Sequence, residues 1–133
     1  MARKGISFKN LNEFKVDLSH YKELTEKQHA VLLKKVAFQL LSLIVEKNPV
    51  DTGRSQNNWQ VAVDEAAGTA TVDGTSTGIN AKALSALNDI KAFSTVTLYN
   101  NVEYIVALEQ GSSRQAPAGM VAVSIVEVQA QFP

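Results

Sequence analysis

The sequence predicts an α+β domain in which one long helix packs on a small, mostly antiparallel sheet, with short additional helices beside it. Three observations predict this fold class. Apolar residues recur at helical spacing over residues 33–45, and apolar residues alternate with others at 59–63 and again at 95–99. Shorter apolar patterns between and after the two alternating runs fit further helices.

The length of the chain bounds its domain organisation. Its 133 residues fit one domain, and a second would have little room. We therefore treat residues 1–133 as a single domain, with residues 1–24 as a helical N-terminal arm and residues 25–133 as the core. Hydrophobic residues make up 45% of the chain, which disfavours disorder and is enough for a self-supporting core.

The composition excludes several classes of protein. The absence of cysteine excludes a disulfide scaffold and any thiolate metal site. Thirteen basic and thirteen acidic residues give a net charge of zero, which argues against a nucleic-acid binder that acts through bulk charge. The apolar stretch 36–45 is expected to be too short to span a bilayer. The first ten residues lack the apolar run of a signal peptide.

Two helices are expected in the first third of the chain. Apolar residues at helical spacing from Leu11 to Tyr21 predict a short amphipathic helix, and Asn10 with Glu13 resembles a capping box at its start. A second capping pattern, Thr25 with Gln28, precedes the apolar stripe of the long helix. Asn48-Pro49 is expected to end that helix, because a residue before proline is disfavoured in the helical region.

A change of period from 3.6 to 2 predicts strands after the long helix. Trp59, Val61 and Val63 alternate with their neighbours, and we expect Trp59 to be a core anchor. Gly68 suggests a turn, and residues 69–72 are expected to form a return strand. Residues 73–78 have the composition of a loop.

The second half of the chain predicts further short elements. Asn80 is expected to cap a short helix whose apolar face is formed by Ala83, Leu84, Leu87 and Ile90. A strand follows at 95–99, then a turn at 100–101. A short helix with Tyr104, Ile105 and Leu108 on one side is expected to close at Gly111, before a loop at 112–119. The run 121–128 fits a helix by spacing, although its β-branched residues favour a strand.

The triplet Asp51-Thr52-Gly53 also carries the catalytic aspartate of aspartic proteases, in which two aspartates share a proton. A dimer of this chain would supply two. The triplet nevertheless follows a long helix, whereas the proteases place it at the end of an apolar strand. A structural interpretation fits better: Asp51 or Thr52 caps the next turn, Gly53 permits an unusual backbone angle, and Arg54 anchors the turn to a carboxylate.

Other patterns in the sequence do not favour a catalytic or metal-binding site. His20 and His29 stand nine residues apart without acidic partners, which argues against a metal site. Residues 74–78, Gly-Thr-Ser-Thr-Gly, have the Gly-x-Ser-x-Gly spacing of many serine hydrolases, but we interpret these glycines as part of a loop and not as a turn between a strand and a helix. The chain has no glycine-rich phosphate loop. We therefore expect a protein that is not an enzyme, with no catalytic, cofactor-binding or metal residues and no cofactor.

Charge is distributed unevenly along the chain. Residues 1–59 contain ten basic and six acidic residues, whereas residues 60–133 contain three basic and seven acidic residues. This division suggests two surfaces of opposite sign, which would suit head-to-tail packing of copies. A basic, solvated helix face is the alternative interpretation.

Two stretches carry a resemblance to a known family. Residues 48–54, Asn-Pro-Val-Asp-Thr-Gly-Arg, precede Trp59, and residues 100–104, Asn-Asn-Val-Glu-Tyr, lead to a Glu-Gln-Gly-Ser-Ser-Arg-Gln-Ala-Pro segment at 109–117. In this order the motifs resemble the tail-completion, or neck, proteins of tailed bacteriophages. The similarity covers about residues 25–130, and residues 73–93 depart from the family pattern.

The resemblance implies a structural virion protein at the head–tail junction or the tail end, assembled in the bacterial cytoplasm. Family members form rings, commonly hexameric, that join the head connector to the tail and line the DNA channel. Implied partners are other copies of the chain, connector or adaptor proteins, and tail terminator or tail tube proteins. DNA would pass without sequence-specific binding, and no membrane is involved.

The resemblance also bears on the end of the chain. It implies that the final segment is a helix, opened by Gly119 with Met120 in its first turn. Two alternative functions stay open: a tail terminator or minor tail protein within the same class, and a dimeric aspartic protease using Asp51.

The loop from Gly111 to Pro117 is the candidate interface. Its polar side chains have little reason to be buried within one copy, so we expect them to contact another subunit or ring. Arg114 would be its charged element. The alternative is a solvated loop in which Arg114 pairs with Glu109 of the same chain. The candidate interface residues are Ser112, Ser113, Arg114 and Gln115.

Overall fold

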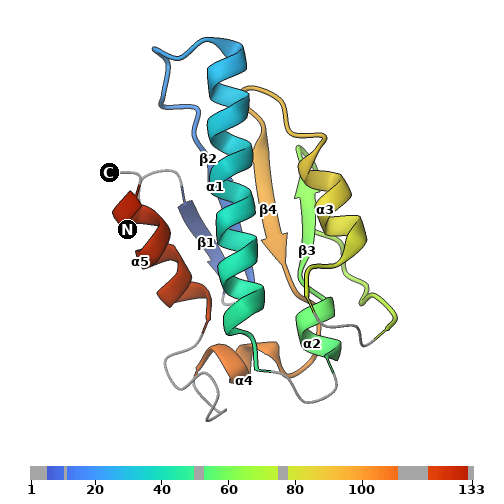
Figure 1. The fold of residues 1–133 in the computed structure, drawn as a ribbon. Helices are drawn as coiled ribbons and strands as arrows, with labels where there is room; N and C mark the ends of the chain where they lie inside the picture. Colours follow the sequence, from blue (N-terminus) through green and yellow to red (C-terminus); the bar gives the residue numbers. More distant parts are fainter. Residues whose placement is uncertain (1–5, 11, 50–52, 75–77, 111–119, 132–133) are drawn as a thin grey trace.

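The computed structural model describes residues 6–10, 12–49, 53–74, 78–110 and 120–131, and it confirms the α+β prediction (Figure 1). An antiparallel four-stranded sheet has the order β1-β2-β4-β3, and α1 crosses one face of it between α5 and α3. The strands are β1 (Ile6–Asn10), β2 (Glu13–Asp17), β3 (Gln60–Val63) and β4 (Thr95–Tyr99). The helices are α1 (Glu26–Lys47), α2 (Arg54–Asn57), α3 (Ala81–Leu87), α4 (Ile105–Glu109) and α5 (Val121–Gln131).

The long helix α1 begins and ends where the sequence predicts. The Thr25 hydroxyl accepts from the Gln28 N–H at 3.1 Å, and the Gln28 side chain accepts from the Thr25 N–H at 3.0 Å. Asn48 leaves the helical region at φ −67° and ψ 125°, as expected before Pro49. The residues of α1 that are buried are His29, Leu33, Val36, Ala37, Leu40, Leu41, Ile44 and Val45.

The stretch 36–45 lies within α1, and the whole helix Glu26–Lys47 is long and apolar enough to cross a membrane by length and composition alone. The core helix of a soluble protein passes the same test, and one face of α1 is buried against the sheet.

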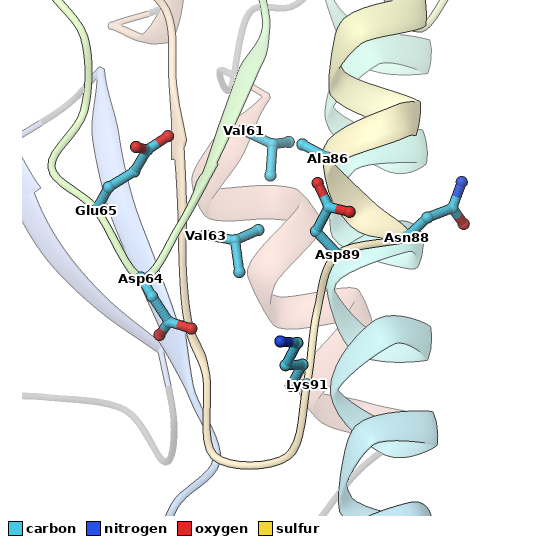
Figure 2. Close-up of a pocket in the computed structure, with 8 residues that line it drawn as sticks. All are labelled: Val61, Val63, Asp64, Glu65, Ala86, Asn88, Asp89 and Lys91. Carbon is cyan, nitrogen blue, oxygen red and sulfur yellow. The ribbon is translucent and has the colours of Figure 1, made fainter.

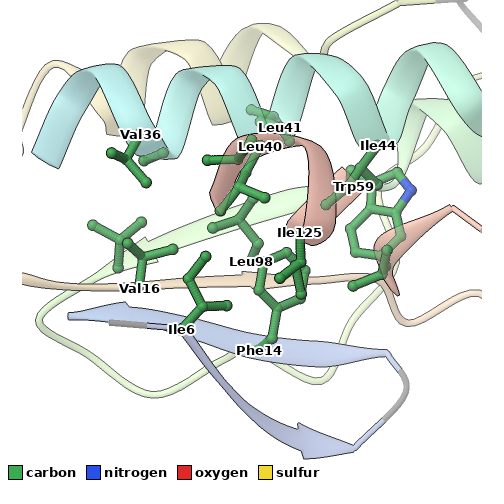
Figure 3. Packing of buried hydrophobic residues seen from close by; sticks show 14 of the residues in the cluster. Ile6, Phe14, Val16, Val36, Leu40, Leu41, Ile44, Trp59, Leu98 and Ile125 are labelled. Carbon is green, nitrogen blue, oxygen red and sulfur yellow. The ribbon is translucent and has the colours of Figure 1, made fainter. Parts of the chain in front are cut away.

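The centre of the core lies between α1 and the two middle strands. Phe14 pairs with Leu98 across β2 and β4, and all of their side-chain surface is buried. Leu40 extends from α1 toward this pair, and Trp59 lies at the same layer near Ile44 (Figure 3). Burial of such large apolar side chains is the main stabilising contribution to a fold of this size.

The prediction of a helix between residues 11 and 21 was wrong, because β1 and β2 form an antiparallel hairpin in this part of the chain. Within β2 the side chains of Phe14 and Val16 are buried, whereas those of Lys15 and Asp17 are exposed, which is a period of two. Asn10 is opposite Glu13 in the hairpin register and is not a helix cap. The first strands therefore belong to the main sheet, and residues 1–24 are not a helical arm.

The return strand expected at residues 69–72 was also wrong. The segment is irregular, and the side chain of Asn58 takes the place of a strand partner: its Oδ1 accepts from the Val72 N–H at 2.7 Å, and its Nδ2 donates to the Val72 carbonyl at 3.1 Å. Asn101 Nδ2 donates to the carbonyls of Gly68 and Ala70, each at 2.9 Å. Side-chain amides thus fix this segment without a ladder.

The later elements largely follow the prediction. The Asn80 side chain caps α3 by accepting from the N–H groups of Lys82 and Ala83, at 2.7 and 3.4 Å. Leu84 was expected on the buried face of α3, but it is 40% exposed and does not belong to that face. The strand at 95–99 is present as β4, and the helix near residue 105 as α4. Its expected closure at Gly111 lies outside the described residues.

The last helix, α5, is held at its start by a side chain from another helix. Glu109, at the end of α4, accepts from the N–H groups of Met120, Val121 and Ala122 at 2.8, 2.8 and 3.0 Å. A carboxylate there satisfies the free N–H groups and interacts favourably with the helix dipole. The helix itself agrees with the family resemblance and not with local β propensity.

Replacing Glu109 with alanine should destabilise the protein by about 1–2 kcal/mol, because three N–H groups lose a charged acceptor. Urea unfolding followed by circular dichroism measures this change. The control is Glu127→Ala, which removes only the 2.9 Å pair with Lys47 and should change stability by less than about 1 kcal/mol. Equal effects of the two substitutions would contradict the capping role.

Candidate functional site at the joint of the two motifs

The two sequence motifs meet at one end of α1, where α2 and α4 also lie (Figure 1). Asn100 Nδ2 donates to the Ser55 carbonyl at 2.8 Å, and both residues are buried. At the surface, Arg54 Nη1 lies 3.0 and 3.1 Å from the two carboxylate oxygens of Glu103. We call this region the motif joint, comprising residues 48, 49, 53–59 and 100–104.

Asn48 connects three parts of the motif joint. Its Nδ2 donates to the Pro49 carbonyl at 2.9 Å and to the Ser55 hydroxyl at 2.8 Å, and its Oδ1 accepts from the Trp59 indole N–H at 2.9 Å. Asn48 is 3% exposed and Trp59 is 1% exposed. Trp59 therefore lies in the core, as expected of an anchor, with its one polar atom satisfied.

The turn that precedes α2 depends on glycine. Gly53 has φ 89° and ψ 0°, a left-handed conformation that residues with a Cβ rarely adopt. Pro49 and Gly53 are both buried. Asp51 and Thr52, which were expected to cap this turn, lie outside the described residues.

The residues after Gly53 are polar but buried. Gln56 Nε2 donates to the Val45 carbonyl of α1 at 2.7 Å, and its Oε1 accepts from the Gly78 N–H at 2.9 Å. Asn57 receives a hydrogen bond on its carbonyl from Asn80 Nδ2 at 3.1 Å. Six amide side chains, each at most 8% exposed, make up what we call the amide cluster. They are Asn48, Gln56, Asn57, Asn58, Asn80 and Asn100.

The amide cluster is suited to holding backbone and not to acid–base chemistry. Amide side chains do not titrate, and most of their partners here are main-chain atoms. The cluster holds the segment around residue 72, the start of α3 and the end of β4 against α1. Its chemistry is therefore that of a structural joint.

On the surface of the joint, Arg54 has the carboxylate partner that the sequence predicts in general terms, and the structure identifies it as Glu103. The pKa of Glu103 is lowered by its own backbone N–H and by the hydrogen bond from Arg54. The pKa of Arg54 is raised by the hydrogen bond to Glu103. The Arg54 guanidinium also lies 5.9 Å from the centre of the Tyr104 ring, within the range of a cation–π contact.

The remaining predicted residues fall into two groups. Ser112, Ser113, Arg114 and Gln115 lie outside the described residues. His29 is fully buried: its Nε2 lies 2.8 Å from the Leu18 carbonyl, and its Nδ1 accepts from the Phe93 N–H at 3.0 Å. Both ring nitrogens are therefore engaged by backbone. Within the described part of the chain, no three His, Cys, Asp or Glu side chains are placed to hold a metal ion.

A groove of about 470 Å³ lies between β3 and the end of α3 (Figure 2). Val61, Val63 and Ala86 supply apolar surface, and Asp89 points into the same space. The Asp64 side chain is held in place by two hydrogen bonds: its carboxylate accepts from the Ser94 hydroxyl and from the Thr95 N–H, each at 2.8 Å. The lining residues are Val61, Val63, Asp64, Glu65, Ala86, Asn88, Asp89 and Lys91.

Sequence reasoning missed the amide cluster and the groove. The only local sign of the cluster was the run Ser55-Gln56-Asn57-Asn58 directly before a core tryptophan. Comparisons with protein-family models, with curated proteins and with solved structures found no match to this chain. The functional conclusion therefore depends on the residues and on the resemblance of the two motifs.

Trp59→Ala should destabilise the protein by about 3–5 kcal/mol, because it removes a large buried side chain and leaves a cavity. Chemical denaturation measures the effect. Trp59→Phe keeps much of the packing but leaves Asn48 Oδ1 without its donor, so an intermediate loss is expected. An unchanged denaturation midpoint for Trp59→Ala would reject its role as a core anchor.

Asn48→Ala should cost about 2–4 kcal/mol, since the Trp59 indole and the Ser55 hydroxyl both lose a buried partner. Arg54→Ala is the matched control at the surface of the same joint, and its denaturation midpoint should hardly move because exposed ion pairs contribute little. If Arg54→Ala proved the more destabilising of the two, the buried cluster would not be what holds the joint.

Proposed function

We propose that this protein is a structural component of a tailed bacteriophage particle, which forms a ring at the head–tail junction and joins the connector to the tail. The observation that carries the proposal is the meeting of the two motifs. The segments that resemble the neck-protein family, 45 to 49 residues apart in sequence, are joined by a buried amide and by a surface ion pair.

The chemistry of this joint supports a scaffold role. A catalytic motif places reactive groups in a cleft, whereas the described motif residues are bonded to backbone or to one another. Arg54 and Glu103 form an ion pair at the surface above this buried network, where it is accessible to a neighbouring subunit. The net charge of zero suits a conduit through which DNA slides.

The position of the aspartate triplet disfavours the protease alternative. Residues 51–53 stand between the end of α1 and the start of α2, so the flanking structure on both sides is helical. Asp51→Asn separates the two possibilities. An aspartic protease would lose cleavage while staying folded, whereas a structural turn would lose stability or assembly.

Loss of the protein from the phage should leave filled heads and tails of normal length that fail to join. Electron microscopy of lysates from a deletion strain, with and without the wild-type gene supplied in trans, measures this. Tails of abnormal length would instead indicate a tail terminator. Normal yields of complete, infectious particles would overturn the proposal.

Arg114→Glu should leave the protein folded but block joining of heads to tails, because a reversed charge at an interface is costly whereas an exposed charge contributes little to stability. Circular dichroism and in vitro joining of heads and tails measure the two effects. Lys82→Glu, an exposed charge change on α3, is the control. Normal joining with the Arg114 variant would exclude an essential contact there.

A further inference from the structure

One side of α1 is exposed and combines positive charge with apolar surface. Lys27, Val31, Lys34 and Phe38 are spaced by four, three and four residues, so they follow one line along the helix. Val31 is 59% exposed and Phe38 is 47% exposed. Both lysines are exposed, and within the described part of the chain neither forms an ion pair. We call these four residues the α1 stripe.

The α1 stripe is not the side of the helix that packs on α5. Leu32 and Val36 line a small cavity with Val128 of α5, and Lys47 pairs with Glu127 of the same helix. These α1 residues lie on a different side of the helix from the stripe. This side of α1 therefore exposes a valine and a phenylalanine beside two exposed lysines, a surface that a partner of matching apolar and acidic chemistry would cover.

The groove between β3 and α3 has the complementary chemistry. Its apolar surface comes from Val61, Val63 and Ala86, whose side chains border the open space in Figure 2. Asp64, Glu65 and Asp89 surround this surface with negative charge against the single Lys91. The groove lies along β3, which is an edge strand of the sheet and so can be approached from outside.

We infer that the α1 stripe of one copy docks into the β3–α3 groove of the next copy, with Phe38 on the valine floor and Lys34 beside Asp89. The choice of a second copy as the partner rests on the proposed ring-forming function. The charge and the apolar content of the two surfaces match, and both are on every copy. Contact between two different surfaces of identical chains is heterologous, and it forms a ring when the rotation closes.

Cysteine trapping tests the contact directly, because the natural chain has no cysteine. Lys34→Cys protein is mixed with Asp89→Cys protein under mild oxidation, and mixed disulfide dimers are counted on a non-reducing gel. We expect trapping several-fold faster than in the control mixture of Lys34→Cys with Val126→Cys, whose second cysteine is on an exposed position of α5. Equal rates in the two mixtures would overturn the inference.

Charge reversal gives a second measurement that does not depend on disulfide geometry. Lys34→Glu and Asp89→Lys should each weaken self-association in light scattering, and a one-to-one mixture of the two should restore it, because every contact in an alternating assembly is again compatible. Failure of the mixture to recover would contradict the pairing. Circular dichroism of each variant checks that it is folded.

The outcomes also separate this inference from the proposed function. Rings of the wild-type protein seen by negative-stain microscopy, together with trapping no faster than the control, would reject this interface while leaving the ring intact. Specific trapping by a protein that phage particles do not need would keep the interface and overturn the role at the head–tail junction.

Discussion

The buried carboxyl end of α1 is the constraint on which the rest of the structure depends. The last carbonyls of a helix have no partner within its regular hydrogen-bond pattern, and at this end of α1 Val45 is 4% exposed and Asn48 is 3% exposed. Gln56 donates to the Val45 carbonyl, while Asn48 links the helix end to Ser55 and to Trp59. The chain can leave α1 inside the molecule only because the following residues supply donors, which explains a polar run directly before the core tryptophan.

Amide side chains also hold together the other segments that meet near the end of α1. Because amide side chains have both donors and acceptors, one residue can hold two stretches of chain, as Asn58 holds Val72 and as Asn100 holds Ser55. Buried hydrogen bonds thus connect the joint beneath the surface pair of Arg54 with Glu103. The proposed stripe-and-groove contact uses other surfaces of the same body.

Elements that depend on local signals could be predicted from the sequence, whereas elements that depend on partners distant in sequence could not. The capping box of Thr25 and the proline after Asn48 are local, so the bounds of α1 follow from sequence. The spacing of Leu11, Phe14 and Leu18 also fits a helix. The segment forms a hairpin instead because β2 pairs with β4, a strand distant in sequence. Arg54 could be assigned a carboxylate in general but not Glu103 in particular. The amide cluster was beyond prediction, because its partners are mostly backbone atoms distant in sequence.

Native-state hydrogen exchange tests the central claim most directly. The backbone N–H groups of Val72, Gly78 and Val102 belong to no helix or strand, yet they donate to the side chains of Asn58, Gln56 and Asn100. If the amide cluster holds the fold together, these three amides should exchange as slowly as those of the core strands, through global unfolding. Exchange at the rate of an open loop would contradict the account.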